Sequence, residues 1–513
     1  ALFRNEMTLY SGRKCGMCEK SIVTMYNPKS PYTVYCNSCY RGDSWNPLDY
    51  AKEYDFNKPF FEQLKELVEH VPKNALYSTT GAGVNIESDY TNCVGGLKNC
   101  YMLFNCSAVE DSMYSRGVTF SSEVVDGYFG MKLDRCYEIV NTHHSSSSTH
   151  TKNISGCVDC HFMRDCSGCT DCFGCVNIRN KQHCWFNEQL SAEEYKKRLS
   201  EVKGSYSHMK AMEEKFYEFS KQFPCRENNN SKIADSIGDY LTECKNVQFS
   251  MELMKSEDSK WNFSSRDLKD SYGTIGYGIK SELLLEVTST GYTSRAIGCW
   301  ACELSQNLEY CISCFPSNKY LIGCDSMRNA EYCILNKKYS KEEYEKIREH
   351  IVKELTDRGV YGLMMPPEIA PFAYNETIAM DNMPMTKEDA LAAGFRWEDD
   401  IQITKGKETM LPEEIPDHIR DVPDSITSEI LRCAQCERNY KITTQELAFY
   451  RKMMLPIPRK CFYCRHHDRV LRRGPYKFWN RECAHCATPI VTNYAPERPE
   501  IVYCEKCYQQ EVI

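Results

Sequence analysis

Two long stretches of the chain lack the 3.6-residue spacing of apolar positions that marks an amphipathic helix. They begin near "SDYTNC" at Ser88 and "GDYLTEC" at Gly238, and both are rich in Cys, Tyr, Ser, Gly and Asp. Short pieces such as "KNCYMLFNC", "EDSMYSRGV" and "DRCYEIV" alternate with turn residues, as in the stacked strands of a β-solenoid. The pattern therefore predicts a mainly β fold with an irregular solenoid as its body.

The two stretches belong to an internal repeat. The segment Cys175–Tyr195, "CVNIRNKQHCWFNEQLSAEEY", recurs 149 residues later as "CDSMRNAEYCILNKKYSKEEY". Both copies end in a capping box, Ser191–Glu194 and Ser340–Glu343, which predicts that a helix follows each one. We therefore expect a duplicated solenoid with helical inserts.

The same cysteine module occurs near both ends of the chain. Residues 12–40 and 480–508 share the pattern IVTxYxPxxPxxVYCxxCY, 468 residues apart, and each module reads C-x2-C-x17-C-x2-C. Two C-x2-C pairs place four thiolates around one tetrahedral Zn2+, and the residues between the pairs have the composition of a short hairpin. The modules predict two zinc ribbons, in which the metal stabilises a unit too small for its own core. The predicted ligands are Cys15, Cys18, Cys36 and Cys39, and then Cys483, Cys486, Cys504 and Cys507.

A third metal site is predicted just before the C-terminal ribbon. Cys433 and Cys436 precede a helix signalled by the capping box Thr443–Glu446, and Cys461 and Cys464 follow that helix. This arrangement indicates a treble-clef knuckle. The pair Cys461 and Cys464 has an alternative partner in Cys483 and Cys486, but the self-contained N-terminal copy argues against that exchange. Three zinc ions per chain are expected, each in a closed four-thiolate site.

The other cysteines are open to several interpretations. A signal-less chain with 31 cysteines, many of them in C-x2-C pairs, indicates reduced, metal-binding thiols in the cytoplasm. The run Cys166, Cys169, Cys172 and Cys175 is similar to a ferredoxin motif, but its repeat 149 residues later retains only the last cysteine, Cys324. Core packing of small thiols is the favoured interpretation, with extra zinc or an iron–sulfur cluster as alternatives. The sequence leaves it open whether these four residues, together with Cys157 and Cys160, bind metal.

The segment Thr142–Lys152, "THHSSSSTHTK", holds three histidines among serines and threonines. Metal capture by the histidines is one interpretation. A solvated serine-rich loop is the other, and it is favoured because such loops usually lie in water.

Charge is distributed unevenly along a chain of net charge −8. Arg451–Arg481 holds ten Lys or Arg against one acid, interleaved with aromatic residues, whereas Val360–Ile430 holds fifteen acids against five bases. Basic residues beside aromatic ones can pair with phosphates and stack on bases, or they can balance the charge of neighbouring zinc–thiolate sites. The acidic segment could fold against the basic knuckle. The candidate nucleic-acid residues are Arg465, Arg469, Arg472, Arg473, Lys477 and Trp479.

Length and motifs restrict the class of protein. The 513 residues suggest about three domains. The chain contains no run of about 18 apolar residues, so no membrane helix is predicted. The start "ALFRNEMTLY" lacks the apolar core of a signal peptide. Triad spacings, phosphate loops and metalloprotease motifs are missing, so no enzyme class is indicated. Aligning Cys15 with Cys483 leads us to expect another C-x2-C pair shortly upstream in the gene.

Four segments resemble a family of large zinc-ribbon proteins from small-genome, candidate-phylum bacteria: "RNEMTLYSGRKC", "SWNPLDYAKEYDFNKPFFEQLKEL", "PPEIAPFAYNETIA" and "DVPDSITSEILRCAQC". The resemblance covers nearly the whole chain and implies zinc sites and a fold rather than a particular activity. The chain has fewer solenoid cysteines than that family, notably over Ser107–Arg135, which argues against a metal array along the whole solenoid.

We therefore predict a non-enzymatic, zinc-binding scaffold with an RNA or ribonucleoprotein partner. A protein–protein adaptor or structural assembly component is the alternative, and an enzyme acting in the solenoid groove comes third. No membrane partner is expected, and the oligomeric state cannot be inferred. The predicted order is zinc ribbon 1–46, helical linker 47–86, solenoid repeat A 87–190, helical insert 191–230, solenoid repeat B 231–339, helix 340–359, acidic proline-containing linker 360–430, treble-clef knuckle 431–470 and zinc ribbon 471–513.

Overall fold

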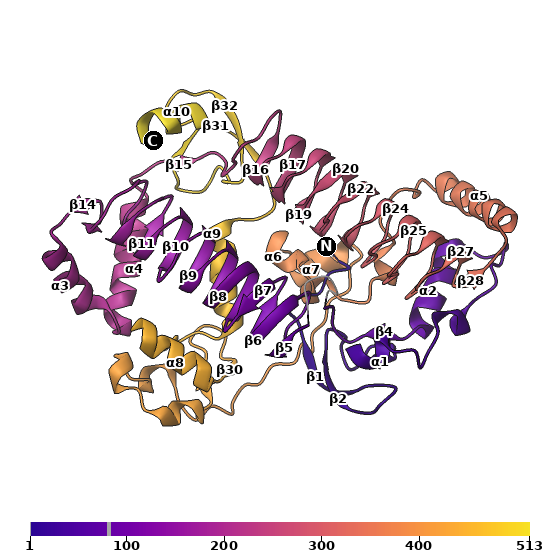
Figure 1. Cartoon of the computed structure of the whole chain (residues 1–513), viewed down its shortest axis with the longest axis horizontal. Coiled ribbons are helices and arrows are strands. Elements are labelled where there is room, and N and C mark those ends of the chain that lie inside the picture. The colour runs from indigo at the N-terminus through magenta and orange to yellow at the C-terminus, as the bar shows by residue number, and fades with distance from the viewer. Residues whose placement is uncertain (1, 79–83, 513) are drawn as a thin grey trace.

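The computed structural model describes residues 2–78 and 84–512, and this part of the chain is mainly β with ten α-helices (Figure 1). The predicted mainly β character with helical inserts is confirmed. Residues 79–83 of the predicted helical linker lie outside the described residues, as do residues 1 and 513 of the two end modules.

The first long stretch forms a ten-stranded sheet, here called stack A. Its strands pair in parallel with partners 12 residues away, so that Thr149 faces both Tyr137 and His161. An antiparallel pair, β13 with β14, closes the sheet. The strands are β5 Ile86–Asp89, β6 Gly95–Phe104, β7 Ser107–Glu110, β8 Met113–Met131, β9 Asp134–His143, β10 Thr149–Ser155, β11 Val158–Arg164, β12 Thr170–Phe173, β13 Cys184–Trp185 and β14 Glu188–Gln189.

The second stretch forms a thirteen-stranded sheet, here called stack B, on the same plan. Parallel partners lie 11 to 13 residues apart, and the antiparallel pair β27 with β28 closes this sheet too. The strands are β16 Ile237–Thr242, β17 Lys245–Met254, β18 Glu257–Lys260, β19 Phe263–Arg266, β20 Leu268–Tyr272, β21 Ile275–Tyr277, β22 Ser281–Leu285, β23 Thr288–Thr290, β24 Ser294–Ile297, β25 Gln306–Glu309, β26 Lys319–Ile322, β27 Glu331–Ile334 and β28 Lys337–Lys338.

A period of three residues organises the interior of stack A. Every third residue from Cys93 to Phe186 has a positive φ, and the residue after it is usually buried in the middle of the stack. Only small or slender side chains fit there, because inward positions from successive strands lie about 4.8 Å apart. Most of these positions hold Val, Leu, Ile, Cys, Ser, Thr or Gly, as in the core of Val94, Leu97, Cys100, Leu103, Cys106 and Val109.

The serine-rich segment Thr142–Lys152 belongs to this stack, so its interpretation as a solvated loop is wrong. It covers the end of β9 and the start of β10, and Ser145, Ser148 and Thr151 are at most 3% exposed. Small hydroxyl side chains occupy inward positions and donate to backbone carbonyls, as Ser145 Oγ does to His143 at 2.8 Å. Their buried polar atoms are therefore satisfied locally.

Helices follow each stack where the capping boxes predict them. Ser191 and Ser340 are the N-caps of α3 (Ala192–Val202) and α5 (Lys341–Asp357), and the reciprocal box is complete at Ser340. Helix α4 (Tyr206–Ser220) leads into stack B, and α2 (Phe60–His70) leads towards stack A. Short helices precede these and punctuate the acidic segment: η1 Pro47–Tyr50, η2 Pro367–Ile369, η3 Tyr374–Glu376, α6 Ala379–Asn382, α7 Lys387–Ala392, η4 Pro412–Glu414, η5 Ile419–Asp421 and η6 Asp424–Thr427.

The acidic segment contacts the basic region near the C-terminus. Asp381 lies 2.8 Å from Nε2 of His466, and Asp424 pairs with Arg451 at 2.5 Å. This contact agrees with the complementary charges of the two segments. Among the described helices, none combines the length and the apolar character needed to cross a membrane.

Candidate metal centres

Three groups of four cysteines bring their sulfur atoms together. Within each group the Sγ atoms all lie within 4.8 Å of one another, and several neighbouring pairs are 3.6–3.9 Å apart. Four thiolates at about 2.3 Å from a central Zn2+ would have edges of about 3.8 Å, so the spacing fits a tetrahedral ion. The groups are Cys15, Cys18, Cys36 and Cys39, then Cys433, Cys436, Cys461 and Cys464, and finally Cys483, Cys486, Cys504 and Cys507.

The first cysteine pair of each group lies at the turn of an antiparallel hairpin. In the N-terminal ribbon, the amide of Cys15 donates to Lys20 and that of Gly16 donates to Val34, which curls the turn around the metal position. The residue after the second cysteine has a positive φ in all three turns: Glu19, Glu437 and Ala487. The hairpins are β1 Tyr10–Lys14 with β2 Ser21–Thr24, β29 Leu431–Arg432 with β30 Asn439–Tyr440, and β31 Trp479–Glu482 with β32 Pro489–Thr492.

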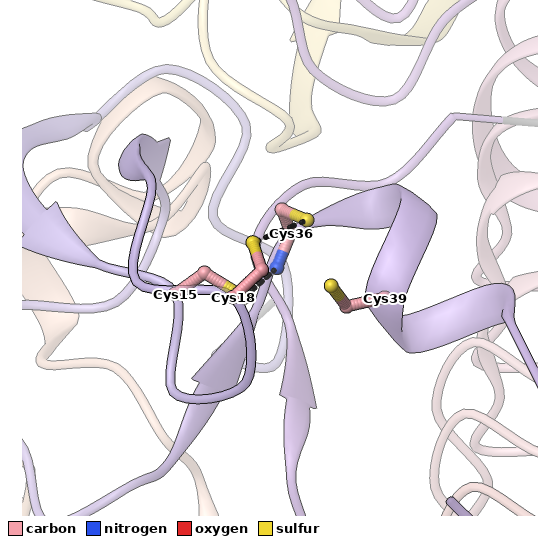
Figure 2. Close-up of side chains that lie close together, drawn as sticks. All are labelled: Cys15, Cys18, Cys36 and Cys39. Atoms are coloured by element: carbon pink, nitrogen blue, oxygen red, sulfur yellow. Dashed lines mark hydrogen bonds between the residues drawn. The ribbon is translucent and has the colours of Figure 1, made fainter. Parts of the chain in front are cut away.

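The second pair of each group opens a helix, as Figure 2 shows for Cys36 and Cys39. The amide of Cys36 points at Cys15 Sγ at 3.2 Å, and the equivalent contacts of Cys461 and Cys504 have the same length. Helix N-termini and amide donors stabilise negative sulfur. The helices are α1 Asn37–Arg41, α9 Phe462–Arg473 and α10 Glu505–Val512.

The surroundings of at least one cysteine in each site favour the thiolate, whereas hydrogen bonds with neighbouring thiols raise the pKa of Cys39 and Cys461. Burial would raise the pKa of Cys15, but backbone N–H groups of Cys18, Cys36 and Met17 lower it to about 6. The hydrogen bond with Cys461 and backbone donors lower the pKa of Cys433 to about 3, against the effect of burial. Because metal-binding cysteines must be deprotonated, these surroundings suit a cation with a preference for sulfur.

The grouping of the twelve cysteines is as predicted, and the exchange of Cys461 and Cys464 with the next module does not occur. The predicted hairpin between the pairs of each ribbon is wrong, however. The strand before Cys36, β3 (Val34–Tyr35), pairs in parallel with β4 (Lys73–Asn74), and β33 (Val502–Tyr503) pairs in parallel with β15 (Cys225–Arg226). Two prolines lie between the strands of each ribbon, and because proline has no N–H to donate to a strand ladder they disfavour pairing across this stretch.

Each ribbon bridges the end of one stack and the start of the other. The N-terminal ribbon bonds to the end of stack B through Tyr40, whose hydroxyl donates to Ser326 at 2.7 Å. The C-terminal ribbon bonds to the end of stack A through Tyr508, whose hydroxyl donates to Asn177 at 2.8 Å. These residues are equivalent under the 468- and 149-residue offsets, so the same contact is made twice.

The predicted nucleic-acid residues fall into two sets. Arg465, Arg469 and Arg473 are at most 5% exposed. Arg465 and Arg469 pair with Asp126 of stack A at 2.8 and 3.0 Å. Lys477 is exposed and lies 5.2 Å from the Trp479 ring centroid.

The remaining arginines of this cluster join the two stacks. Arg473 donates to Tyr128 of stack A at 2.5 Å and lies 3.8 Å from Glu252 of stack B. Arg472, partly exposed, pairs with Glu138 at 2.5 Å. A phosphate in solution can therefore reach Arg472, Lys477 and Trp479 more readily than the buried arginines.

The six stack cysteines left open by the sequence are buried inside stack A. Cys157, Cys160, Cys166, Cys169, Cys172 and Cys175 are at most 2% exposed and share one core. Each thiol donates to a backbone carbonyl, as Cys166 does to Arg164 at 3.1 Å. Their three-residue spacing is that of the inward positions, so the C-x2-C run reflects the packing of small side chains.

One buried ion pair could not be predicted from the sequence. Lys73 Nζ and Asp325 form an ion pair in which both side chains are at most 2% exposed, where the N-terminal ribbon meets stack B. Burial raises the pKa of Asp325 and lowers that of Lys73, and each opposes the shift of the other. The two residues are 252 positions apart in the sequence, so no local pattern predicts the contact.

Comparisons with known proteins do not assign the chain to a family. No family model matches the chain, and no curated protein matches it. Among solved structures, a UDP-N-acetylglucosamine acyltransferase from Campylobacter jejuni aligns with 53% of this chain and 92% of its own, at 7% identity and a TM-score of 0.08. A similarity this weak carries no argument about fold or function.

Proposed function

We propose that the chain is a zinc-stabilised, non-enzymatic scaffold whose body is a duplicated β-solenoid. The parallel strands with 12-residue offsets support the solenoid, and the three sulfur tetrahedra support three zinc ions. All four ligand positions of each site are protein thiolates, so a bound zinc would have no open position for a substrate. The observation that carries the proposal is that two of these sites sit at equivalent junctions between the stacks.

RNA or a ribonucleoprotein is the proposed partner of the C-terminal zinc module. The exposed ammonium of Lys477 beside the indole of Trp479 supports this, because cations pair with phosphates and aromatic rings stack on bases. The N-terminal ribbon has Leu9 and Ser11 at the equivalent positions, so the two ribbons should differ in this property.

The test combines purification with a salt series. Anaerobically purified protein should contain three zinc ions by mass spectrometry, and sequencing should identify co-purified RNA. Lys477→Gln with Trp479→Ala should weaken RNA binding and flatten its salt dependence by about one unit of slope per lost phosphate contact. Lys20→Gln, at an exposed lysine of the N-terminal ribbon, is the control.

Two results would redirect the proposal. Unchanged RNA affinity in the double variant would favour a protein–protein adaptor. One zinc or fewer per chain would contradict the proposal that zinc stabilises the scaffold. Substantial iron with a visible absorption band would indicate an iron–sulfur cluster instead.

A further inference from the structure

A cleft of about 870 Å³ lies between stack A, helix α4, the knuckle and the C-terminal ribbon. Its volume is in the range of small-molecule sites, about 300–1,000 Å³. Stack A supplies one wall through β9, β10 and β11, and α4 and α9 supply two others. The cleft is separate from the three cysteine clusters, and the proposed scaffold function does not use it.

One end of the cleft gathers three cations from three elements. Lys152 of β10 faces Arg164 of β11 directly in the parallel register, and Arg498 comes from the C-terminal ribbon. Lys152 Nζ and Arg498 Cζ lie 5.7 and 5.3 Å from the centroid of the Tyr494 ring. Like charges at directly opposed positions on neighbouring strands repel each other.

Lys152 differs from the two arginines because it makes no direct ion pair. Arg164 lies 3.2 Å from Asp165, and Arg498 pairs with Glu500. Among residues 2–78 and 84–512, no carboxylate lies within ion-pair distance of Lys152, and its Nζ donates to the Arg472 carbonyl at 2.7 Å. Asp165, Glu500 and Asp239 act on Lys152 only from beyond ion-pair distance. An anion bound directly to this ammonium would therefore add to the stability of the folded chain.

Aromatic side chains line part of the remaining wall of the cleft, beside the carboxylates Glu213, Glu214 and Glu218 of α4. His150 is partly exposed and stacks on the buried Phe162, with ring centroids 4.5 Å apart. Helix α4 contributes the half-buried Phe216 and the exposed Tyr217, and both line the cleft. Aromatic side chains of this kind stack on nucleobases.

We propose that this cleft binds a nucleotide, with its phosphate at Lys152, Arg164 and Arg498 and its base against the aromatic side chains of the cleft. A phosphate monoester carries close to two negative charges and several acceptor oxygens, which matches a site with three convergent cations. Free nucleotides and the phosphates of single-stranded RNA share this chemistry.

Calorimetric titration of the zinc-loaded full chain with AMP, adenosine and inorganic phosphate tests the site. AMP should bind more tightly than adenosine or phosphate alone. Lys152→Met should weaken AMP binding about tenfold or more, because a charge-assisted hydrogen bond is lost, and Lys152→Arg should retain it. Lys269→Met, at an exposed lysine on stack B, is the matched control.

The outcomes separate this site from the proposed RNA surface. Short single-stranded RNA that displaces AMP identifies RNA as the source of the phosphate, and RNA that leaves AMP bound identifies a free nucleotide. Lys477→Gln with Trp479→Ala should leave AMP binding unchanged whatever it does to RNA binding. Equal affinity for AMP in wild type and Lys152→Met, at equal zinc content and thermal stability, would overturn the proposal, as would adenosine binding as tightly as AMP.

Discussion

The two ribbons make the same backbone and tyrosine contacts with the stacks, but the buried side chains at the two junctions differ in charge. At each junction, a two-residue parallel strand pair joins the ribbon to the segment that leads into a stack. In the N-terminal junction this segment carries Lys73, which pairs with Asp325; the equivalent residues in the other junction are Cys225 and Val176, both at most 2% exposed. Backbone pairing and the tyrosine contact are therefore shared, and the buried charges are specific to one junction.

This difference between the junctions indicates which interactions both of them require. A buried ion pair often contributes little beyond an apolar pair of similar volume, whereas removing one partner is strongly destabilising. The N-terminal ribbon also shares a large core with α2, α5 and stack B. The C-terminal ribbon packs in a small core of Cys225, Cys483, Ile490, Tyr494, Val502 and Cys507, so it should depend more on its metal.

The largest expected effect is the loss of a metal ligand. Cys483→Ser should lose one zinc and unfold the C-terminal ribbon locally, because the binding free energy of a structural zinc, about 10–16 kcal/mol in isolated fingers, is folding free energy. Cys15→Ser should also lose one zinc but loosen the end of stack B as well, through the shared core. Metal analysis, limited proteolysis near Arg481 and hydrogen exchange would distinguish the two.

Cys244→Ser is the control for both substitutions. Cys244 is a buried stack cysteine whose thiol donates to the Thr242 carbonyl at 3.4 Å, a contact that a serine can also make. This variant should keep three zinc ions. Collapse of the β signal in Cys483→Ser would contradict the local character of the damage.

The second largest effect on stability is expected when the buried charges of the N-terminal junction are replaced. Lys73→Met leaves Asp325 buried without its partner and should cost about 3–5 kcal/mol in the free energy of unfolding. The double variant Lys73→Cys with Asp325→Val copies the other junction and should recover most of that loss. Denaturant unfolding of the single and double variants measures the difference, and a double variant no more stable than Lys73→Met would mean that the junctions are not equivalent.

An aspartate near the start of each stack allows a comparison of how the stability of the folded chain depends on pH. Asp239 of stack B is fully buried near the C-terminal ribbon, whereas Asp89 of stack A is exposed. Burial raises the pKa of Asp239 to about 6, against the effect of hydrogen bonds from Asn229 and Tyr240. The folded chain therefore holds this proton more tightly than the unfolded chain, and stability is lost as the pH rises from about 4 to about 6.

Asp239→Asn should remove this loss. The stability gained by the variant should be about 1 kcal/mol larger at pH 7 than at pH 5. Asp89→Asn, at the exposed counterpart, should show no such difference. Urea unfolding of both variants at the two pH values provides the measurement, and an equal gain of Asp239→Asn at both would assign the carboxylate an ordinary pKa.

The smallest effect should come from the paired tyrosine hydroxyls. Tyr40→Phe and Tyr508→Phe each remove one hydrogen bond and should cost about 1 kcal/mol or less. Tyr40 should cost more, since its bond to Ser326 is fully buried and that of Tyr508 to Asn177 is partly exposed. A larger loss in Tyr508→Phe would reverse this ranking of the two junctions.

The confirmed predictions rest on patterns within short stretches of the sequence. Cysteine spacing grouped all twelve candidate ligands because each pair lies within one turn, and the capping serines marked the starts of α3 and α5. The three-residue period is visible in the run from Cys166 to Cys175, and the favoured interpretation of core packing agrees with the burial of these cysteines in one core.

Contacts between distant segments could not be predicted in this way. Arg465 is separated from its partner Asp126 by 339 residues, so the basic region looked free to bind a ligand when much of it is bound within the chain. The charge balance along the sequence indicated that acids and bases would meet, but not that the acids of stack A would be the partners. Only the folded arrangement identifies which cations remain unpaired.

The crossed docking of the ribbons also has a consequence for ancestry and for dissection of the chain. A chain of half the length, with one stack and one ribbon, could make these junctions only as a two-fold dimer in which each ribbon reaches the other subunit. Duplication and fusion, with one ribbon moved to the other end of the chain as the unequal offsets of 468 and 149 residues require, would turn that exchange between subunits into the bridging seen within this chain. Fragments separated at Gly204, between α3 and α4, should then associate with each other before either becomes stable, so the covalent link there sets local concentration more than it sets structure.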